Sequence, residues 1–466
     1  MSRIVVLGGS LIGLATALMI TEQGHEVTVL ERDPEPPPAT AEEAIDGWER
    51  PGVMQFQLVS FLVPRGRQLL DQHLPAVSAR LIREGGGEYN CLANMPPSVT
   101  DRSPRPGDER FATLAARRPL FEYAMATVAD GAVDVRRGVH VTGLLSDGHR
   151  RVTGVRLRDA ARRDAELAAD LVIDAMGRRS PLPGWLAAIG VTAPAEDSED
   201  LGFVYYGRYF QSPAPARLTG GLFHYDCYSV LVLPSDRGTW SATLVTSSRD
   251  RALRPLREEA NFAKLVGACP VNAPILELEP IGDIFAAAGI SDRRRQLVDG
   301  GAPVVTGVLT VGDAWACTNP SLGRGMTIGL MHAAVTAEAV AEHIADPVAL
   351  AVEHDRLTTE RILPWYRATT QVDRQRAAQV AAAIEGRPPA PPPGNPVAEL
   401  MRDITVAMRT DPDMYRAFYE TVYLLALPQD LLARPGLAER ASQLAGGRAP
   451  TLPPGPSRPE LLAMLS

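Results

Sequence analysis

A strand–turn–helix–strand pattern opens this chain and constrains its fold more than any other feature. The apolar strand spans residues 4–7, the glycine-rich turn 8–13, the helix 14–23 and the second strand 26–30. Gly24 stands where helices commonly end in a left-handed conformation, and Glu31 stands at the carboxyl end of the second strand. This order predicts a βαβ unit and therefore an α/β fold built on a parallel sheet.

The turn has the spacing of a phosphate-binding loop. It reads Gly8-Gly9-Ser10-Leu11-Ile12-Gly13, with serine at the second glycine of the fingerprint G-x-G-x-x-G. Serine is small enough to let the backbone approach a pyrophosphate, and the first amides of the following helix point toward that anion. Glu31 follows Gly13 by 18 residues, near the ~20 expected for an acid that binds ribose hydroxyls. We predict a dinucleotide site, against the alternative of a glycine-rich turn that binds no ligand.

A second glycine motif follows an apolar strand predicted over 304–311 and precedes a long helix predicted over 325–344. It contains Gly312-Asp313-Ala314, then Pro320, then Gly323-Arg324-Gly325-Met326. A helix that starts after such a turn directs its positive end toward whatever lies there. The alternative is a left-handed turn that only starts a helix.

Both motifs, in this order, resemble those of the FAD-dependent monooxygenase superfamily, which includes the aromatic hydroxylases and squalene epoxidase. The resemblance covers about residues 1–35, 112–190 and 300–345. It implies that Asp313 binds the ribityl or pyrophosphate part of FAD, and that the helix after Gly323 stabilises negative charge on the reduced flavin. The predicted FAD-binding residues are Gly8, Ser10, Leu11, Ile12, Gly13, Glu31, Arg32, Arg118, Val141, Gly312, Asp313, Pro320, Gly323, Arg324, Gly325 and Met326.

Arg118 enters this set because it precedes a helix start that reads Leu120-Phe121-Glu122. The resemblance implies that an arginine at this position reaches FAD. A solvated arginine at the start of a helix is an equal alternative.

A third stretch matches the family only in part. Residues 170–180 read DLVIDAMGRRS, with Met176 where the family has the aspartate of its DG motif, which serves FAD and the nicotinamide cofactor. A thioether accepts hydrogen bonds weakly and carries no charge. We expect NADPH or NADH to be the ultimate electron donor, with either slow direct reduction or a partner flavin reductase. Asp174 or Arg178 could substitute for the missing aspartate, although Asp174 could equally just end a strand.

Length and pattern predict two or three joined domains. We expect an FAD-binding Rossmann-like three-layer domain from 1–45, 112–190 and 300–345, a substrate domain from 46–111 and 191–299, and a C-terminal helical segment over 346–466 with a proline-rich break at 386–396.

Aromatic and β-branched residues over 201–210, 221–234 and 238–247 predict an antiparallel sheet in the substrate domain, with a hairpin turn at 235–238. We predict that Tyr206, Arg208, His224 and Tyr228 line the substrate pocket. A half-exposed strand histidine is the alternative for His224. His332, on the long helix, is expected to be a packed or capping histidine.

Charge and cysteine content exclude other classes. The 466 residues carry a formal net charge of −8 and no long basic run, which argues against nucleic acid as a partner. The four cysteines show no paired spacing, which favours reduced thiols in the cytoplasm over a zinc site or disulfides. The sequence shows no signal peptide, and no apolar run reaches the ~18 residues of a membrane span. We expect a cytoplasmic protein that is not an integral membrane protein.

The resemblance implies a flavin-dependent monooxygenase that uses O2 through a flavin C4a-hydroperoxide. No metal-binding, P-loop or nucleophile-elbow motif occurs, so we assign no catalytic side chain and expect the flavin to carry the chemistry. The stretch NPSLGRGMTIGL is similar to one in squalene epoxidase and favours hydroxylation or epoxidation of an apolar, polyketide- or terpenoid-like molecule.

Two other functions stay open: a reductase or dehydrogenase of the geranylgeranyl reductase type, and a non-enzymatic FAD-binding protein. The flavin-dependent halogenases share the fold of this superfamily. Their W-x-W-x-I-P signature is missing, and the single lysine, Lys264, is in no matching context.

Overall fold

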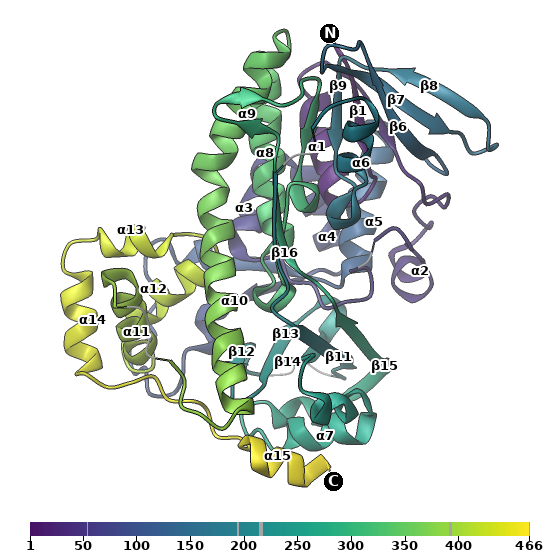
Figure 1. The fold of residues 1–466 in the computed structure, drawn as a ribbon. Helices are drawn as coiled ribbons and strands as arrows, with labels where there is room; N and C mark the ends of the chain where they lie inside the picture. Colours follow the sequence, from purple (N-terminus) through teal and green to yellow (C-terminus); the bar gives the residue numbers. More distant parts are fainter. Residues whose placement is uncertain (54, 193–194, 214–217, 391–393, 466) are drawn as a thin grey trace.

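The N-terminal strand lies at the centre of a five-stranded parallel sheet (Figure 1). The computed structural model describes residues 1–466 except 54, 193–194, 214–217, 391–393 and 466. The strand order is β19 (Val308–Thr310), β9 (Leu171–Asp174), β1 (Arg3–Leu7), β2 (Glu26–Leu30) and β5 (Asp134–Arg136). The predicted βαβ unit is confirmed, because β1 and β2 are parallel and are joined through α1 (Leu11–Thr21).

Both faces of this sheet are buried, which explains why β1 is a continuous apolar run. Ile4 and Val6 contribute to the core on the helical side, whereas Val5 and Leu7 contribute to the core on the opposite side. The helical layer contains α1, α3 (Pro64–His73), α4 (Pro75–Arg83), α5 (Arg118–Asp130) and α8 (Gly325–His343). The opposite layer contains β6 (His140–Ser146), β7 (Val152–Arg158), β8 (Asp164–Ala168) and α6 (Leu182–Ala188). Residues 64–83, assigned above to the substrate domain, pack against α8 and α5.

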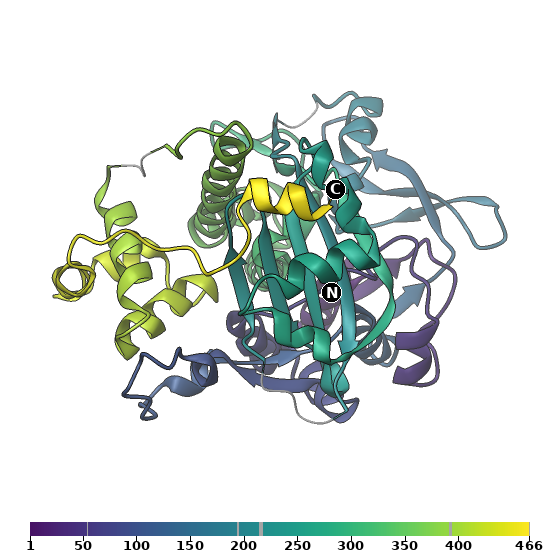
Figure 2. The same cartoon turned by 90° about the horizontal axis from the view of Figure 1, so that it is seen from below.

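The segment predicted as the substrate domain contains a five-stranded antiparallel sheet, as predicted. Its order is β12 (Gly221–His224), β13 (Ser229–Pro234), β14 (Thr239–Ser247), β11 (Phe203–Gln211) and β15 (Glu279–Ala288). The turn predicted at 235–238 joins β13 to β14. Figure 2 shows α7 (Glu259–Gly267) and α15 (Arg458–Leu465) across the face of this sheet that is directed away from the parallel sheet. The two faces of the antiparallel sheet therefore have different neighbours.

A small third sheet joins the halves. Its central strand, β16 (Asp292–Gln296), pairs with β10 (Ala195–Glu199) and β20 (Ala316–Cys317), both antiparallel. Because β16 follows β15 and β20 follows the turn at Asp313, this sheet connects the second glycine motif to the substrate sheet. Short pairs form from β3 (Gly87–Asn90) with β4 (Ala112–Ala115) and from β17 (Val298–Asp299) with β18 (Ala302–Pro303).

The C-terminal segment is helical, as predicted. Of two long helices, α9 (Pro347–Arg361) lies beside α8, and α10 (Leu363–Ile384) continues downward past the antiparallel sheet (Figure 1). A separate cluster contains α11 (Pro396–Ala407), α12 (Pro412–Val422), α13 (Pro428–Leu432) and α14 (Leu437–Ala445). Of the proline-rich break, residues 391–393 lie outside the described residues. Among the helices described, none combines the length and apolar character needed to cross a membrane.

A buried ion pair fixes the β13–β14 turn against the start of α5. Asp236 is fully buried and accepts hydrogen bonds from the backbone N–H and the guanidinium of Arg117, with Nη2 2.7 Å from Oδ2. Removing one partner of such a pair leaves the other charge buried and uncompensated.

We expect Asp236→Ala to lower the free energy of unfolding by about 3–5 kcal/mol, measured as a shift of the urea unfolding midpoint. Arg356→Ala is the control, because Arg356 forms ion pairs with Glu353 and Glu360 on an exposed face of α9. This substitution should leave the urea unfolding midpoint nearly unchanged. Equal midpoints for the two variants would contradict the structural role of Asp236.

Candidate functional site

The glycine-rich turn brings the start of α1 close to β1. Gly8 has a φ of +106°, and a Cβ atom on Gly13 would lie 1.9 Å from the Gly8 carbonyl oxygen. The first intrahelical bond of α1 is donated by Leu14 to Ser10. The preceding amides therefore have no intrahelical acceptor and are available to an anion.

Glu31 lies opposite this turn, as the sequence predicts for a ribose-binding acid. Its Oε2 accepts from the Gly9 N–H at 2.6 Å, and its Oε1 accepts from the Asp33 N–H at 2.8 Å. A carboxylate oxygen can accept two hydrogen bonds, so Oε1 still has capacity for a ribose hydroxyl.

Arg50 is the residue of this groove that the sequence analysis missed. It is 5% exposed, and its Nη2 donates to the Gly9 carbonyl and to Glu31 Oε2, both at 3.1 Å. Its Nε donates to Asp33 Oδ2 at 3.0 Å. Burial lowers the pKa of Arg50, but Glu122, Glu31 and Asp33 together raise it above its usual value. No motif marks this arginine, because it follows a loop with no regular spacing.

Arg118 extends the same groove from the start of α5. Its Nη2 lies 2.7 Å from Glu122 and 3.3 Å from Ser10 Oγ, to which it donates. Ser10 in turn donates to Glu122 at 2.6 Å instead of capping α1. The Arg118 side chain is 13% exposed, so the alternative of a solvated arginine does not hold.

The second glycine motif packs directly on the first. Cβ atoms on Gly312 and Gly329 would lie 3.0 and 2.6 Å from the Ile12 side chain, so both glycines allow α1 and α8 to approach. Burial raises the pKa of Asp313, and Arg118 is the charge that most opposes this increase. The predicted ligands Arg118 and Asp313 are therefore near neighbours in space, although they come from different motifs.

His332 supports the Asp313 turn from behind. Its Nδ1 accepts from the Gly312 N–H at 3.2 Å, and its Nε2 lies 3.2 Å from Thr358 Oγ1. An accepting Nδ1 requires the neutral ring with its proton on Nε2, and burial lowers the pKa of His332 well below its usual value. The interpretation as a packed, capping histidine is confirmed.

The start of α8 forms the third part of the site, after Pro320 and Gly323. The side chain of Arg324 turns away from it, because its guanidinium donates to Thr369 and to the carbonyls of Thr421 and Val422. Any contact of Arg324 with a flavin is thus restricted to its backbone. The first helical bond runs from Ile328 to Arg324, which leaves the amides of Gly325 and Met326 available to a ligand.

Two other predicted ligands are less central. Arg32 is exposed, and Val141 packs on the apolar core behind the parallel sheet.

Asp174 shapes the turn that carries Met176. It is fully buried, and it accepts from the Ser180 hydroxyl and from the Met176 N–H. Burial raises the pKa of Asp174 to about 6. These contacts favour the interpretation that Asp174 ends its strand. Arg178 donates to the Gly289 carbonyl and lies near enough to Asp313 to influence its pKa.

Three of the four predicted pocket residues lie on the face of the antiparallel sheet that is directed away from the cofactor domain. Tyr206 and Tyr228 belong to the core under α7 and α15, and Arg208 pairs with Glu259 of α7 at 2.5 Å. Strand alternation separates the two faces, but it does not say which face meets the cofactor domain. Only His224, whose Nδ1 lies 2.9 Å from Ser229 Oγ, faces that domain.

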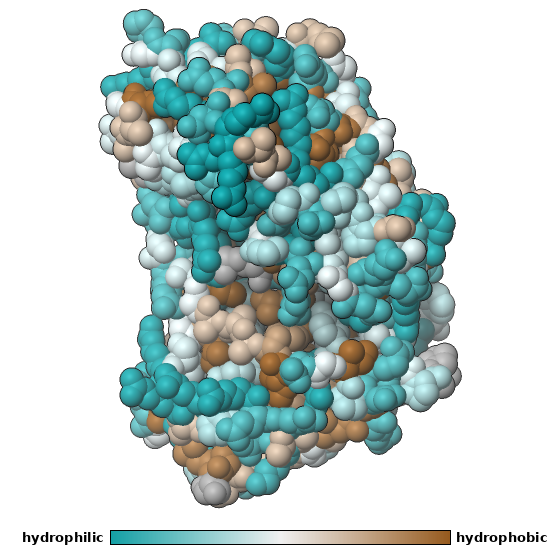
Figure 3. All heavy atoms as spheres, turned by 90° about the vertical axis from the view of Figure 1, so that its right-hand side faces the viewer, coloured by the Kyte–Doolittle hydropathy of each residue, from teal (hydrophilic) through white to brown (hydrophobic). Residues whose placement is uncertain are grey.

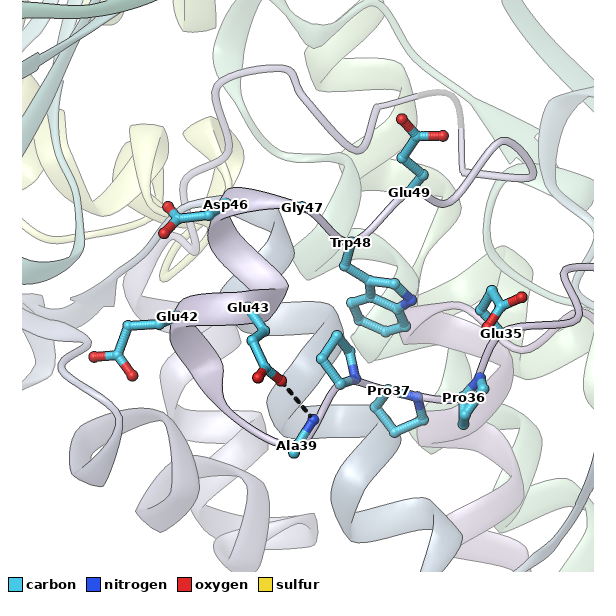
Figure 4. Close-up of a pocket in the computed structure, with 11 residues that line it drawn as sticks. Glu35, Pro36, Pro37, Ala39, Glu42, Glu43, Asp46, Gly47, Trp48 and Glu49 are labelled. Carbon is cyan, nitrogen blue, oxygen red and sulfur yellow. Dashed lines mark hydrogen bonds between the residues drawn. The ribbon is translucent and has the colours of Figure 1, made fainter.

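A separate hollow of about 900 Å³ lies beside α2 (Ala41–Asp46), as Figure 4 shows. Its lining consists of a proline run, the Trp48 indole and five carboxylates: Glu35, Glu42, Glu43, Asp46 and Glu49. Carboxylates at this density repel a phosphate group. This hollow is therefore a poor match for a dinucleotide, and the glycine turn remains the predicted site.

The donor set of the groove fits FAD. Free helix amides and two guanidiniums suit a pyrophosphate, and Glu31 suits ribose hydroxyls. The closely packed glycines leave no room for side chains between the helix ends.

Comparison with known proteins agrees with this geometry. Residues 3–50, which include β1, α1, β2 and Arg50, match the family described as pyridine nucleotide-disulphide oxidoreductase. The chain is 28% identical over 383 residues to Protein Rv3254 of Mycobacterium tuberculosis, with 77% of each chain covered. It is 35% identical over 86 residues to 2,6-dihydroxypyridine 3-monooxygenase of Paenarthrobacter nicotinovorans, which covers 18% of this chain and 20% of that protein.

Two solved structures with the same fold are flavoproteins. A flavoprotein/dehydrogenase from Cytophaga hutchinsonii superposes with a TM-score of 0.65 at 14% identity, covering 96% of this chain and 99% of that one. A triple mutant of the flavin-dependent brominase Bmp2 superposes with a TM-score of 0.60 at 15% identity, with the same coverage. The chain has the fold of these flavoproteins. The predicted fold is confirmed, and the family match over residues 3–50 together with these flavoprotein structures supports FAD as the cofactor.

Gly13→Ala tests the turn of this FAD-dependent fold. A methyl group 1.9 Å from the Gly8 carbonyl oxygen would force the turn open and withdraw the α1 amides. We expect the purified variant to lose its flavin absorbance. Gly184→Ala is the control, because a Cβ atom there meets nothing within 4 Å. Full flavin occupancy in Gly13→Ala would contradict the assigned groove.

Asp313→Ala tests the second motif. Loss of a hydrogen bond to FAD should weaken binding by about 0.5–1.5 kcal/mol, or up to ~3 kcal/mol if a charge takes part. The fluorescence of released flavin measures this affinity, and circular dichroism checks the fold. Asp299→Ala, at an exposed position of β17, should behave as the parent. Equal FAD affinity in the two variants would contradict the role assigned to Asp313.

Proposed function

We propose that this protein is an FAD-dependent monooxygenase that transfers one oxygen atom of O2 to an apolar small molecule. The observation that carries the proposal is the apolar face that the antiparallel sheet directs toward the cofactor domain. When bound, FAD supplies the redox chemistry. The chain supplies binding, orientation and exclusion of water.

Alternate residues of β11 build much of this face. The Tyr205 hydroxyl lies 3.4 Å from Asn319 Oδ1, and the Tyr209 hydroxyl donates to the Leu58 carbonyl at 3.2 Å. The Tyr209 ring packs against Phe285, with centroids 6.1 Å apart. Figure 3 shows a hollow with a largely apolar floor at the level between α2 and β15, below a hydrophilic upper surface. Such a surface favours an apolar substrate.

The binding residues divide into two sets. The α1 amides, Arg50 and Arg118 would hold the pyrophosphate of FAD, and Glu31 would hold the ribose. The α8 amides would place partial positive charge beside a bound flavin, and such charge would favour its reduced form. No side chain needs to act as a nucleophile in this scheme.

Halogenation is less favoured than oxygen insertion. Lys264 is on α7, where its Nζ donates to the Met464 carbonyl of α15 at 2.5 Å. The only lysine therefore lies on the face of the substrate sheet opposite the cofactor domain.

A reductase or dehydrogenase is the second candidate. The likeness to the Cytophaga hutchinsonii flavoprotein/dehydrogenase supports it, because that match has the higher TM-score of the two described above. Turnover under ¹⁸O2 separates the two functions. A monooxygenase places one labelled atom in the product and the other in water, whereas a dehydrogenase places none in the product.

Electron supply gives a further prediction. Met176→Asp introduces a charged acceptor at the position where the family has its aspartate, whereas Met176→Leu changes only the shape. In anaerobic stopped-flow mixing with NADPH, we expect slow flavin reduction in the parent and in Met176→Leu, and roughly tenfold faster reduction in Met176→Asp, the equivalent of ~1.4 kcal/mol in the barrier.

Reduction of the parent as fast as turnover, without a partner protein, would rule out an obligate flavin reductase. In that case Arg178→Ala is the next variant, since Arg178 is partly exposed whereas Asp174 is buried.

A further inference from the structure

Arg324, the residue just before α8, has a side chain buried against the C-terminal helices. It is 6% exposed. Its Nη2 donates to the Thr421 carbonyl at 2.7 Å and its Nε donates to the Val422 carbonyl at 3.2 Å, both at the end of α12. Its Nη1 donates to Thr369 Oγ1 of α10 at 3.2 Å. The guanidinium is therefore held by uncharged groups from two helices.

The positive charge of Arg324 is only partly compensated. Within the part of the chain that the structure describes, no carboxylate forms an ion pair with Arg324, and Asp373 is the charge that raises its pKa. Burial lowers that pKa to about 10, so the guanidinium stays charged at neutral pH. Burial also raises the pKa of Asp373 to about 7, so that carboxyl is not fully ionised there. The end of α12 contributes roughly half a negative charge.

This charge is attached to the helix start that the proposed function places beside the flavin. The Arg324 carbonyl accepts the first helical bond of α8 from Ile328, and the next two amides, of Gly325 and Met326, are available to a ligand. The guanidinium and the free amides thus come from adjacent residues. Because a buried charge is screened less than an exposed one, its field adds to that of the helix end.

We propose that Arg324 raises the reduction potential of the bound flavin, by holding a buried positive charge at the start of α8 without touching the flavin through its side chain. The proposal rests on the FAD site of the proposed function. Reduced flavin carries more negative charge than oxidised flavin, so a nearby positive charge stabilises the reduced form. Arg324 is a positioning residue in this scheme, because α10 and α12 fix where its charge lies.

The test measures the reduction potential of the FAD-loaded full chain by anaerobic titration against a reference dye. In Arg324→Gln we expect the ratio of reduced to oxidised flavin at a fixed potential to fall about tenfold, the size of effect of one charge ~10 Å away in a protein. The glutamine amide still donates to a carbonyl at the end of α12. This variant therefore removes the charge and keeps part of the contact.

Three further variants separate charge from structure. Thr369→Val removes one acceptor of Arg324 but leaves the charge, so the ratio should stay close to that of the parent. Arg356→Gln removes an equal charge from the exposed face of α9, where solvent and salt screen it, and should also leave the ratio unchanged. Asp373→Asn, measured at pH 8 where this carboxyl is mainly ionised, removes a negative charge and should raise the ratio.

The inference is overturned if Arg324→Gln keeps the ratio of the parent, or if Thr369→Val lowers the ratio equally. If Arg324→Gln does not retain FAD, Asp373→Asn decides, and a ratio that does not rise at pH 8 overturns the inference. Failure of the proposed function gives a different result. A parent protein that binds no FAD would remove the flavin site itself, whereas unchanged potentials in FAD-loaded variants would remove only the role of Arg324.

Discussion

The close approach of α1 to β1 and α8 is the contact on which the site depends. Gly13 allows α1 to start against the Gly8 carbonyl, and Ile12 then fits against Gly312 and Gly329. Two helix N-termini and the Asp313 turn consequently meet at one edge of the parallel sheet. A single methyl group at this point would separate elements that are 300 residues apart in the sequence. The glycines at these positions therefore serve packing as much as ligand contact.

Charge in the groove is balanced by residues from several segments. Glu31, Asp33 and Glu122 bring three carboxylates, and Arg50 and Arg118 bring two guanidiniums. Because the guanidiniums already have anionic partners, an incoming pyrophosphate competes with carboxylates for them and depends more on the α1 amides. We therefore expect the backbone amides of the turn to contribute more to pyrophosphate binding than any one side chain.

The sequence was sufficient to predict the features that depend on local spacing. The glycine turns, Glu31, Asp313 and the alternation of β11 could all be read from short patterns. Arg50 could not, because its position depends on how an irregular loop folds back onto β2. The orientation of Tyr206, Arg208 and Tyr228 could not either, since alternation has the same pattern whichever face is turned to the cofactor.

The order of strands in the parallel sheet has a consequence for synthesis of the protein. The strands come from residues 3 to 310, and the groove is complete only when Gly329 of α8 reaches Ile12. The N-terminal βαβ unit gains β5 and β9 once residues 136 and 174 have been made, but the outer edge of β9 stays unpaired until β19 is made at residues 308–310. Such edges recruit other strands. Free FAD cannot bind fully to this intermediate, because the part of the predicted site that α8 contributes does not exist until α8 is made.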